Sequence, residues 1–276
     1  MSQLVSLDFP VYNEEDNLPE HYAQVSGEFE GADHDIEFVF VDDGSHDTSL
    51  QLIRELAARD PRVSGLTLSR NFGHEAAIEA GMRHAQGDAV IIMDADLQDS
   101  PTALPALVER WRAGADVAYA VRKNRKEGVL QRAAFTGFYR LAQRMMSIDL
   151  PRDAGPFCLM SREALNAVNS MGERGRYFPG LRAYAGFRQE AVEVERNARH
   201  AGETKYSFIG RSAGAINAIF SFSKLPLRLV SLFGFVAAGI ALLGALWVII
   251  GSLTTDQDTP GWVSLMTVVL LVSGVQ

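Results

Sequence analysis

The chain has 276 residues and a formal net charge of −8 at pH 7, with 47% hydrophobic and 22% charged residues. That hydrophobic content excludes an intrinsically disordered chain, and the single cysteine, Cys158, excludes a fold held together by disulfides. The charge is segregated: residues 1–121 hold 7 basic and 23 acidic side chains, residues 122–228 hold 19 and 9, and residues 229–276 hold none and 2.

The first 121 residues alternate short β-rich runs with amphipathic helical runs. We expect strands over residues 4–9, 36–42, 63–69, 89–94 and 115–120, and helices over residues 47–59, 74–84 and 102–113. Such alternation predicts an α/β fold with a mainly parallel sheet that helices cover on both faces. Ligands bind these sheets at the carboxyl ends of the strands, so we expect the chemistry at that edge.

Polar and mostly acidic loops follow four of the predicted strands. They read PVYNEEDNL from Pro10, VDDGSHDTS from Val41, SRNFGHEAAIEAG from Ser69 and DADLQDSP from Asp94. An acidic loop can do no more than cap the next helix, and this interpretation stays open for Asn13 and Asp47. The convergence of four such loops on one edge of a sheet predicts a polar ligand site.

The fourth loop carries the clearest signal for a metal ion. Asp94 and Asp96 directly follow an apolar strand, and Gln98 comes two residues later. These oxygen ligands suit Mg²⁺ or Mn²⁺, with diphosphate oxygens completing the octahedron. A calcium-binding EF-hand is excluded because positions 6 and 12 of the loop are Asp99 and Pro105. The sequence also lacks the Gly-x-x-x-x-Gly-Lys phosphate loop and the His-Glu-x-x-His zinc motif.

The middle of the chain is basic and predicts a phosphate-bearing acceptor. Basic residues cluster after the fifth strand and recur further on: Arg122, Lys123, Arg125, Lys126, Arg132, Arg196, Arg199 and Lys205. Arginine suits phosphate because its planar guanidinium donates two parallel hydrogen bonds. A solvated helix face or attraction to anionic lipid headgroups is the alternative for any single residue. Nucleic acid is not expected as a partner, because no nucleic-acid-binding motif accompanies the basic residues.

Two uncharged runs near the C-terminus predict membrane helices. Residues 229–255 carry no charge, which exceeds the roughly 20 apolar residues that cross a bilayer. Residues 259–276 predict a second span, which the end of the chain cuts short. Basic residues precede the first span and acidic ones follow it, which favours residues 1–228 on the cytoplasmic side. We therefore expect a multi-pass protein of the cytoplasmic membrane.

Two further stretches are candidates for helices at the membrane surface. Arg132, Arg140 and Arg144 form a polar stripe on an otherwise apolar helical pattern, and residues 206–224 form an apolar pattern with few charges. Packing into a protein core is the alternative for both stretches. Glycines within the first span, such as Gly234 and Gly239, permit packing between subunits.

In order and spacing, the four loops resemble those of family 2 glycosyltransferases of the GT-A fold, in the polyprenyl-phosphate branch that includes dolichol-phosphate mannose synthase. AVRKNRKEGVLQR from Ala120, DAGPFCLMSRE from Asp153 and RNARHAGETKYS from Arg196 resemble later motifs of the same branch. The resemblance covers essentially residues 4–250. It implies a Rossmann-like catalytic domain on the cytoplasmic face of the membrane, followed by interfacial and transmembrane helices.

The resemblance also implies roles for individual residues. The nucleotide-sugar donor would be bound by Pro10, Tyr12, Glu14, Asp42, Asp43, Asn71 and Asp94. Asp96 and Gln98 would hold the divalent ion that bridges the diphosphate, and the acceptor phosphate would meet Arg122, Arg132, Arg199 and Lys205. Domain boundaries follow: residues 1–121 bind the donor, 122–205 bind the acceptor, 206–228 lie at the membrane, and 229–255 and 259–276 span it.

The implied reaction moves one hexose from UDP-glucose, GDP-mannose or a UDP-amino sugar to undecaprenyl phosphate, with inversion. The catalytic residues would be Asp94, Asp96, Arg122, Arg132 and Asp153. One motif departs from the branch, because Pro156 and Cys158 stand where many members have a polar residue and an arginine. Asp153 is the nearest candidate base, with a capping role as its alternative. A catalytically altered scaffold or nucleotide-sugar sensor, or a transferase with another membrane acceptor, stays open.

Overall fold

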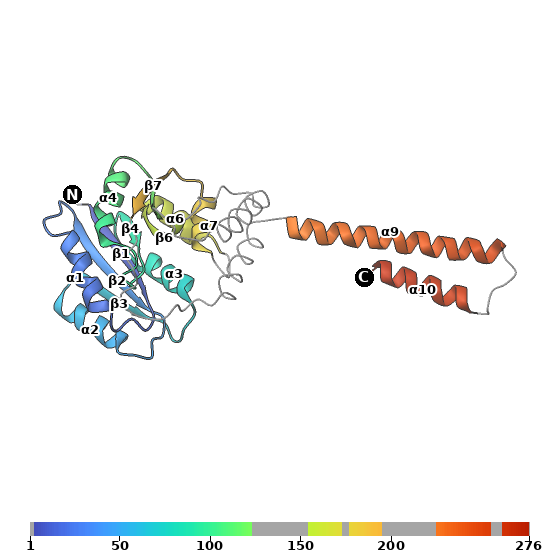
Figure 1. Cartoon of the computed structure of the whole chain (residues 1–276), viewed down its shortest axis with the longest axis horizontal. Coiled ribbons are helices and arrows are strands. Elements are labelled where there is room, and N and C mark those ends of the chain that lie inside the picture. Colours follow the sequence, from blue (N-terminus) through green and yellow to red (C-terminus); the bar gives the residue numbers. More distant parts are fainter. Residues whose placement is uncertain (1–2, 123–153, 173–176, 195–224, 255–260, 276) are drawn as a thin grey trace, which may run out of the picture. The chain divides into compact units, whose positions relative to one another are not determined.

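The computed structural model describes residues 3–122, 154–172, 177–194, 225–254 and 261–275 (Figure 1). The chain divides into two compact units, residues 1–218 and residues 219–276. The first is an α/β unit and the second a pair of apolar helices. The proposed interfacial helix after Arg132 and the one at 206–224 both lie outside the described residues.

A single seven-stranded sheet organises the described part of the α/β unit. Its order is β3-β2-β1-β4-β6-β5-β7. The strands are β1 (Leu4–Val11), β2 (Asp35–Asp42), β3 (Val63–Thr67), β4 (Ala89–Ile92), β5 (Val117–Arg122), β6 (Ala154–Ser161) and β7 (Gln189–Val194). The four strands on the β3 side run parallel, as predicted. β6 runs antiparallel to both β4 and β5, so the sheet is mixed.

Helices cover both faces of the sheet. One face carries α1 (Leu18–Glu28), α2 (Ser49–Arg59), the short 3₁₀ turn η1 (Pro101–Ala103) and α4 (Leu104–Arg112), and the other carries α3 (His74–His84), α6 (Arg162–Ser170) and α7 (Phe178–Tyr184). Alternate residues of β1 serve the two layers: Leu7 and Phe9 pack with α1 and α4, whereas Asp8 faces α3. This two-sided burial explains why β1 is buried from Val5 to Val11.

The predicted elements of the first 121 residues match the structure closely. The expected helices at 47–59, 74–84 and 102–113 correspond to α2, α3 and the η1–α4 pair. The prediction missed α1, whose Pro19 and low amphipathicity hide its helical pattern, and it missed β6 and β7 beyond residue 121. The assignment of residues 1–121 to donor binding and 122–205 to acceptor binding stays a prediction.

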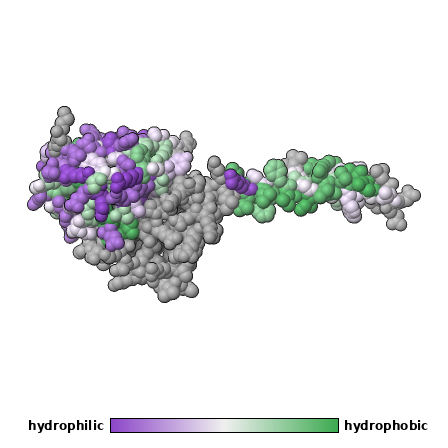
Figure 2. Space-filling model, turned by 90° about the horizontal axis from the view of Figure 1, so that it is seen from above, coloured by the Kyte–Doolittle hydropathy of each residue, from purple (hydrophilic) through white to green (hydrophobic). Residues whose placement is uncertain are grey.

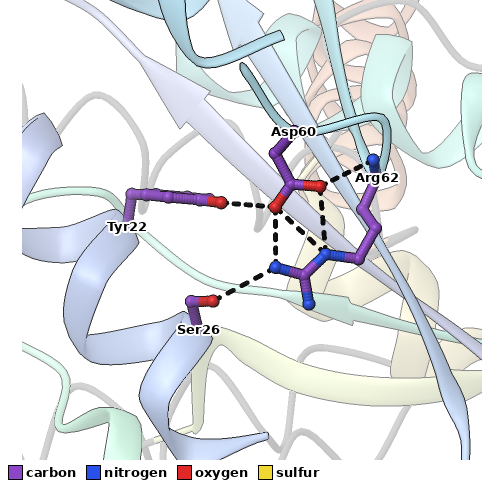
Figure 3. A network of polar contacts seen from close by, with 4 residues as sticks. All are labelled: Tyr22, Ser26, Asp60 and Arg62. Atoms are coloured by element: carbon purple, nitrogen blue, oxygen red, sulfur yellow. Dashed lines mark hydrogen bonds and ion pairs between the residues drawn. The ribbon is translucent and has the colours of Figure 1, made fainter. Parts of the chain in front are cut away.

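A polar network fastens α1 to the turn that leads into β3 (Figure 3). The Tyr22 hydroxyl donates to Asp60 at 2.5 Å, and the Arg62 guanidinium binds the same carboxylate at 2.6 Å. The Arg62 side chain holds the pKa of Asp60 well below its usual range, against the effect of partial burial, and the Tyr22 bond acts in the same direction. This network lies at the amino end of β3, away from the loops that follow the strands.

The second unit consists of α9 (Leu225–Thr254) and α10 (Trp262–Val275), which pack against each other. Figure 2 shows hydrophobic side chains over these helices and mostly hydrophilic ones on the α/β unit. Among the described residues, Leu227–Gly251 is long and apolar enough to cross a membrane, by length and composition. Trp262–Gly274 is apolar but shorter, so of the two predicted spans only the first has a full-length counterpart.

Candidate functional site

A cavity of about 420 Å³ opens where the strands end, and we call it the strand-end pocket. Its walls come from the end of β1, the loops after β1, β2, β3 and β4, and the start of α3. The lining residues are Pro10, Val11, Tyr12, Glu14, Asp43, Asn71, Gly73, His74, Ala77, Asp94, Ala95 and Asp96. The four predicted loops therefore do meet at one edge of the sheet, and they enclose a hollow rather than a flat surface.

The loop after β1 is fixed by the loop after β2. Asn13 has a left-handed backbone with φ of 51°, and its side-chain oxygen accepts the His46 backbone N–H at 2.8 Å. The Ser49 hydroxyl accepts the Glu14 backbone N–H at 2.9 Å. Asp47 accepts the backbone N–H of Ser49, the first residue of α2, at 3.0 Å and that of Glu15 at 3.2 Å, so it joins the two loops at the start of this helix. Tyr12 and Glu14 therefore line the pocket from a well-anchored segment.

The two neighbouring aspartates after β2 have different surroundings. Asp42 is buried and accepts hydrogen bonds from the Thr67 hydroxyl and the Ser45 backbone N–H, and it does not line the pocket. Asp43 does line it, and its two oxygens accept the backbone N–H groups of Phe72 and Gly73 at 2.7 and 2.9 Å. Asp43 therefore holds the segment that carries Asn71 into the pocket.

Asp94 forms an ion pair with His74 inside the pocket. His74 Nε2 lies 2.6 Å from Asp94 Oδ1, and each side chain is 30% exposed. Burial opposes the charged imidazole, but the Asp94 carboxylate and, more weakly, Glu75 and Asp8 favour it, and the pKa of His74 rises to about 9. The Asp94 carboxylate therefore favours the protonated, cationic form of His74.

Asp96 and Gln98 lie in the turn after β4. The Gln98 amide donates to Asp96 at 2.7 Å, and Leu97 between them has a left-handed φ of 57°. The described residues contain no group of three or more His, Cys, Asp or Glu side chains that could hold a metal ion. One pocket carboxylate with an adjacent amide nevertheless fits Mg²⁺ or Mn²⁺, because these ions take most ligands from water and substrate phosphates.

The far side of the pocket edge belongs to β5 and β6. Val121 pairs with Ala154, so the end of β5 meets the start of β6 there. Arg122 ends β5, but its side chain is not among those described, and Arg132, Asp153, Arg199 and Lys205 lie outside the described residues. The proposed acceptor-binding residues therefore remain predictions.

A buried guanidinium supports the start of β6. Arg182 on α7 is fully buried, donates to the Gly155 carbonyl at 3.2 Å and lies 5.2 Å from the centre of the Tyr119 ring. Cys158 is also fully buried, and burial raises the pKa of its thiol although Arg182 opposes the shift. Cys158 is thus a residue of the core.

Two residues of the site were not predicted. His74 stands within the third loop motif, and its position at the start of a helix after a strand could have indicated a pocket residue. Asp8 does not line the pocket, but it lies beneath α3 and contributes to the raised pKa of His74; it was placed in the first predicted strand with no role. A charged residue inside an apolar strand was the available signal.

The chain is similar to known glycosyltransferases in sequence and in fold. The family model described as "Glycosyl transferase family 2" matches residues 7–168. An uncharacterized glycosyltransferase of Bacillus subtilis, YkcC, is 40% identical over 98% of this chain and 84% of its own length. The bactoprenol glucosyl transferase of Shigella phage SfV is 38% identical over 99% of this chain and 89% of its own. The mannosyltransferase PcManGT of Pyrobaculum calidifontis, solved with GDP-Man and Mn²⁺, has a TM-score of 0.56 at 16% identity, covering 100% of this chain and 86% of that one.

Proposed function

Because the chain belongs to glycosyl transferase family 2, we propose that it moves a single hexose from a nucleotide-sugar to a polyprenyl phosphate at the cytoplasmic face of the membrane. The observation that carries the proposal is the strand-end pocket, which gathers Asp43, Asp94 and Asp96 around one cavity. The similarity to a bactoprenol glucosyl transferase over nearly the whole chain supports the choice of acceptor.

The donor occupies the strand-end pocket in this proposal. Tyr12 and Glu14 meet the nucleoside, since a phenol can stack or hydrogen-bond and a carboxylate accepts from base N–H or ribose hydroxyl groups. Asp43 shapes this end of the pocket through the Phe72 and Gly73 backbone. Asp94 accepts hydrogen bonds from ribose or sugar hydroxyls.

Asp96, with Gln98 beside it, is the proposed ligand of the divalent ion. When bound, the ion supplies positive charge that stabilises the departing nucleoside diphosphate. The Gln98 amide holds the Asp96 carboxylate through one hydrogen bond, so the ligand is oriented before the donor arrives. The Mn²⁺ bound to PcManGT supports a divalent ion without deciding between magnesium and manganese.

The acceptor needs no strong base. A phosphate monoester already carries an anionic nucleophilic oxygen at neutral pH, so Asp153 is not required to remove a proton. That oxygen attacks the anomeric carbon, the bond to the diphosphate breaks, and the configuration inverts in one step. Arg122, Arg132, Arg199 and Lys205 are the proposed phosphate ligands, and they would screen the charge between the two anionic substrates.

The apolar helix pair fits a lipid-borne acceptor. The stretch Leu227–Gly251 has a mean hydropathy of 2.4, which suits a membrane span that keeps the enzyme where its acceptor resides. We include α10 as a second, shorter membrane segment, in a multi-pass protein of the cytoplasmic membrane.

Two measurements on the full chain in detergent test the proposal. The first is the change in melting temperature with UDP-glucose, GDP-mannose and UDP-amino sugars in the presence of Mg²⁺ or Mn²⁺, because a donor that binds the native state raises it. The second is transfer of radiolabelled hexose to undecaprenyl phosphate. Donor binding without transfer to any polyprenyl phosphate would leave a nucleotide-sugar sensor or another acceptor as the better function.

A further inference from the structure

The His74–Asp94 ion pair connects the first residue of α3 to the loop after β4. The distance of 2.6 Å between Nε2 and Oδ1 is typical of a charge-assisted hydrogen bond. Both residues line the strand-end pocket, and both side chains keep 30% of their surface exposed. The pair is therefore part of the pocket wall, where it can affect a bound donor directly.

The imidazole of His74 stands on a firmly held backbone. Immediately before it, the Phe72 and Gly73 N–H groups are bound by Asp43. Immediately after it, the Glu75 carboxylate accepts the Phe178 backbone N–H of α7 at 2.9 Å. The helix itself packs against the sheet through Gly81, which is buried next to Asp8 of β1. A donor group on such a rigid base can fix the direction of its acceptor.

Asp94 lies two residues beyond β4, in the turn that contains Leu97 with its left-handed backbone. A carboxylate bound through one oxygen presents the other in a defined direction. Hydrogen bonds to a substrate hydroxyl are lost steeply when the acceptor is misaligned. The contact with His74 therefore restricts the directions that the Asp94 carboxylate can take.

We propose that His74 is a positioning residue that orients the Asp94 carboxylate toward hydroxyl groups of the donor's sugar or ribose. This inference rests on the proposed function for the identity of the ligand. It assigns no chemical step to His74 itself, whose role acts through Asp94.

A double-mutant cycle separates positioning from direct binding. The variants are His74→Leu, which removes the donor, His74→Gln, which keeps an N–H group, and Asp94→Ala, alone and combined with His74→Leu. His84→Gln is the matched control, since His84 is an exposed residue on the same helix. Calorimetry measures the affinity for UDP-glucose and for GDP-mannose in the presence of Mn²⁺. The variants are compared on the donor that the wild type binds.

We expect His74→Leu and Asp94→Ala each to weaken donor binding by roughly tenfold, and the double variant to be no weaker than Asp94→Ala alone. His74→Gln should recover most of the loss, and His84→Gln should match the wild type. If the two single losses multiply in the double variant, His74 contacts the donor independently and the inference is wrong. Unchanged affinity in His74→Leu would overturn it as well.

A ligand-free measurement keeps this inference distinct from the proposed function. The imidazole resonance of His74, assigned by its absence in His74→Gln, should titrate well above pH 7 in the wild type and at a clearly lower pH in Asp94→Ala, where burial of the imidazole is no longer opposed by the Asp94 carboxylate. A titration that does not change in Asp94→Ala would refute the ion pair. Failure of hexose transfer with an intact cycle would instead count against the proposed acceptor.

Discussion

Asp8 of β1 packs directly against Gly81 of α3, so closely that a Cβ atom at position 81 would lie 1.8 Å from Asp8 Oδ1. Asp8 is fully buried, and no group among the described residues makes a hydrogen bond to either of its side-chain oxygens. Burial raises the pKa of Asp8 well above its ordinary value, although His74 opposes the shift. A helix glycine thus makes room for an acid that the folded state prefers to keep neutral.

We predict that Asp8→Asn raises the stability of the α/β unit at pH 8 by about 1–3 kcal/mol, because it removes the cost of a buried carboxylate without partners. The pKa of Asp8 is higher in the folded state, so this cost is absent near pH 4 and grows as the pH rises above the ordinary value of 3.8. Melting temperatures of the full chain at pH 4.5 and 8 check this. A variant less stable than the wild type at pH 8 would contradict it.

A substitution at Gly81, which faces Asp8, is expected to lower the stability. Gly81→Ala brings a methyl group into the Asp8 carboxylate, and the forced shift of α3 should cost about 1–3 kcal/mol. Gly172→Ala is the control, because nothing lies within 4 Å of a Cβ atom there. Equal melting temperatures for the Gly81 and Gly172 variants would show that α3 does not pack on Asp8.

The burial of His21 predicts that the protein loses stability in acid. It is fully buried on α1 with its ring edge-on to Phe9 at 4.8 Å, and burial lowers its pKa to about 4, although Asp94 acts against the shift. Because the pKa of His21 is lower in the folded state, its contribution to the free energy of unfolding is fully present above pH 6.5. The free energy of unfolding then falls by roughly 3 kcal/mol in total as the pH drops toward 4.

His21→Leu removes this titration while it keeps an apolar contact with Phe9. We expect its melting temperature to change less than that of the wild type between pH 6.5 and 4.5. His46→Leu serves as the control, because His46 is exposed and should leave the profile unchanged. Parallel pH profiles for wild type and His21→Leu would mean that His21 does not limit stability in acid.

Asp43 accepts the backbone N–H groups of Phe72 and Gly73, so a substitution there should affect both stability and binding. Asp43→Asn exchanges one acceptor oxygen for an N–H₂ group that faces the Phe72 or Gly73 N–H, so one of two hydrogen bonds is lost. Each unmade buried bond costs about 1–3 kcal/mol. We expect a lower melting temperature and weaker nucleotide-sugar binding by calorimetry.

Asp35→Asn is the matched control for Asp43→Asn, since Asp35 is exposed at the start of β2 and Asp43 follows the end of that strand. It should change neither quantity. A variant at Asp43 that loses affinity with no loss of melting temperature would indicate that Asp43 touches the donor itself rather than shaping the loop.

The sequence predicted the convergence of the four loops because parallel strands carry their carboxyl ends to one edge, whatever the details of packing. Tyr12, Asp43, Asp94 and Asp96 were therefore found as pocket residues from local patterns. The antiparallel insertion of β6 between β4 and β5 was not predicted, because it pairs residues some 70 positions apart with no local signal.

The contacts that individual side chains make could not be predicted from the sequence either. The contact between His74 and Asp94 joins residues 20 positions apart, and that between Asp43 and Gly73 joins residues 30 apart, through loops whose exact path depends on tertiary packing. The protein contacts of the two aspartates assigned to the donor by resemblance were hidden as well. Asp43 accepts backbone N–H groups of the loop after β3, and Asp42 accepts from Thr67 and Ser45. Their part in donor binding stays a prediction.

Asp96 carries the last prediction, the dependence on a divalent ion. If its carboxylate holds the ion, Asp96→Ala should make donor affinity independent of added Mn²⁺, and EDTA should reduce wild-type affinity to the same level. Turnover should fall by about 100-fold, which corresponds to the several kcal/mol that an ion contributes at a leaving diphosphate. Asp16→Ala is the control, an exposed acid of the loop after β1. A Mn²⁺-dependent gain in affinity that survives in Asp96→Ala would place the ion on other ligands, because Gln98 alone offers only a neutral carbonyl.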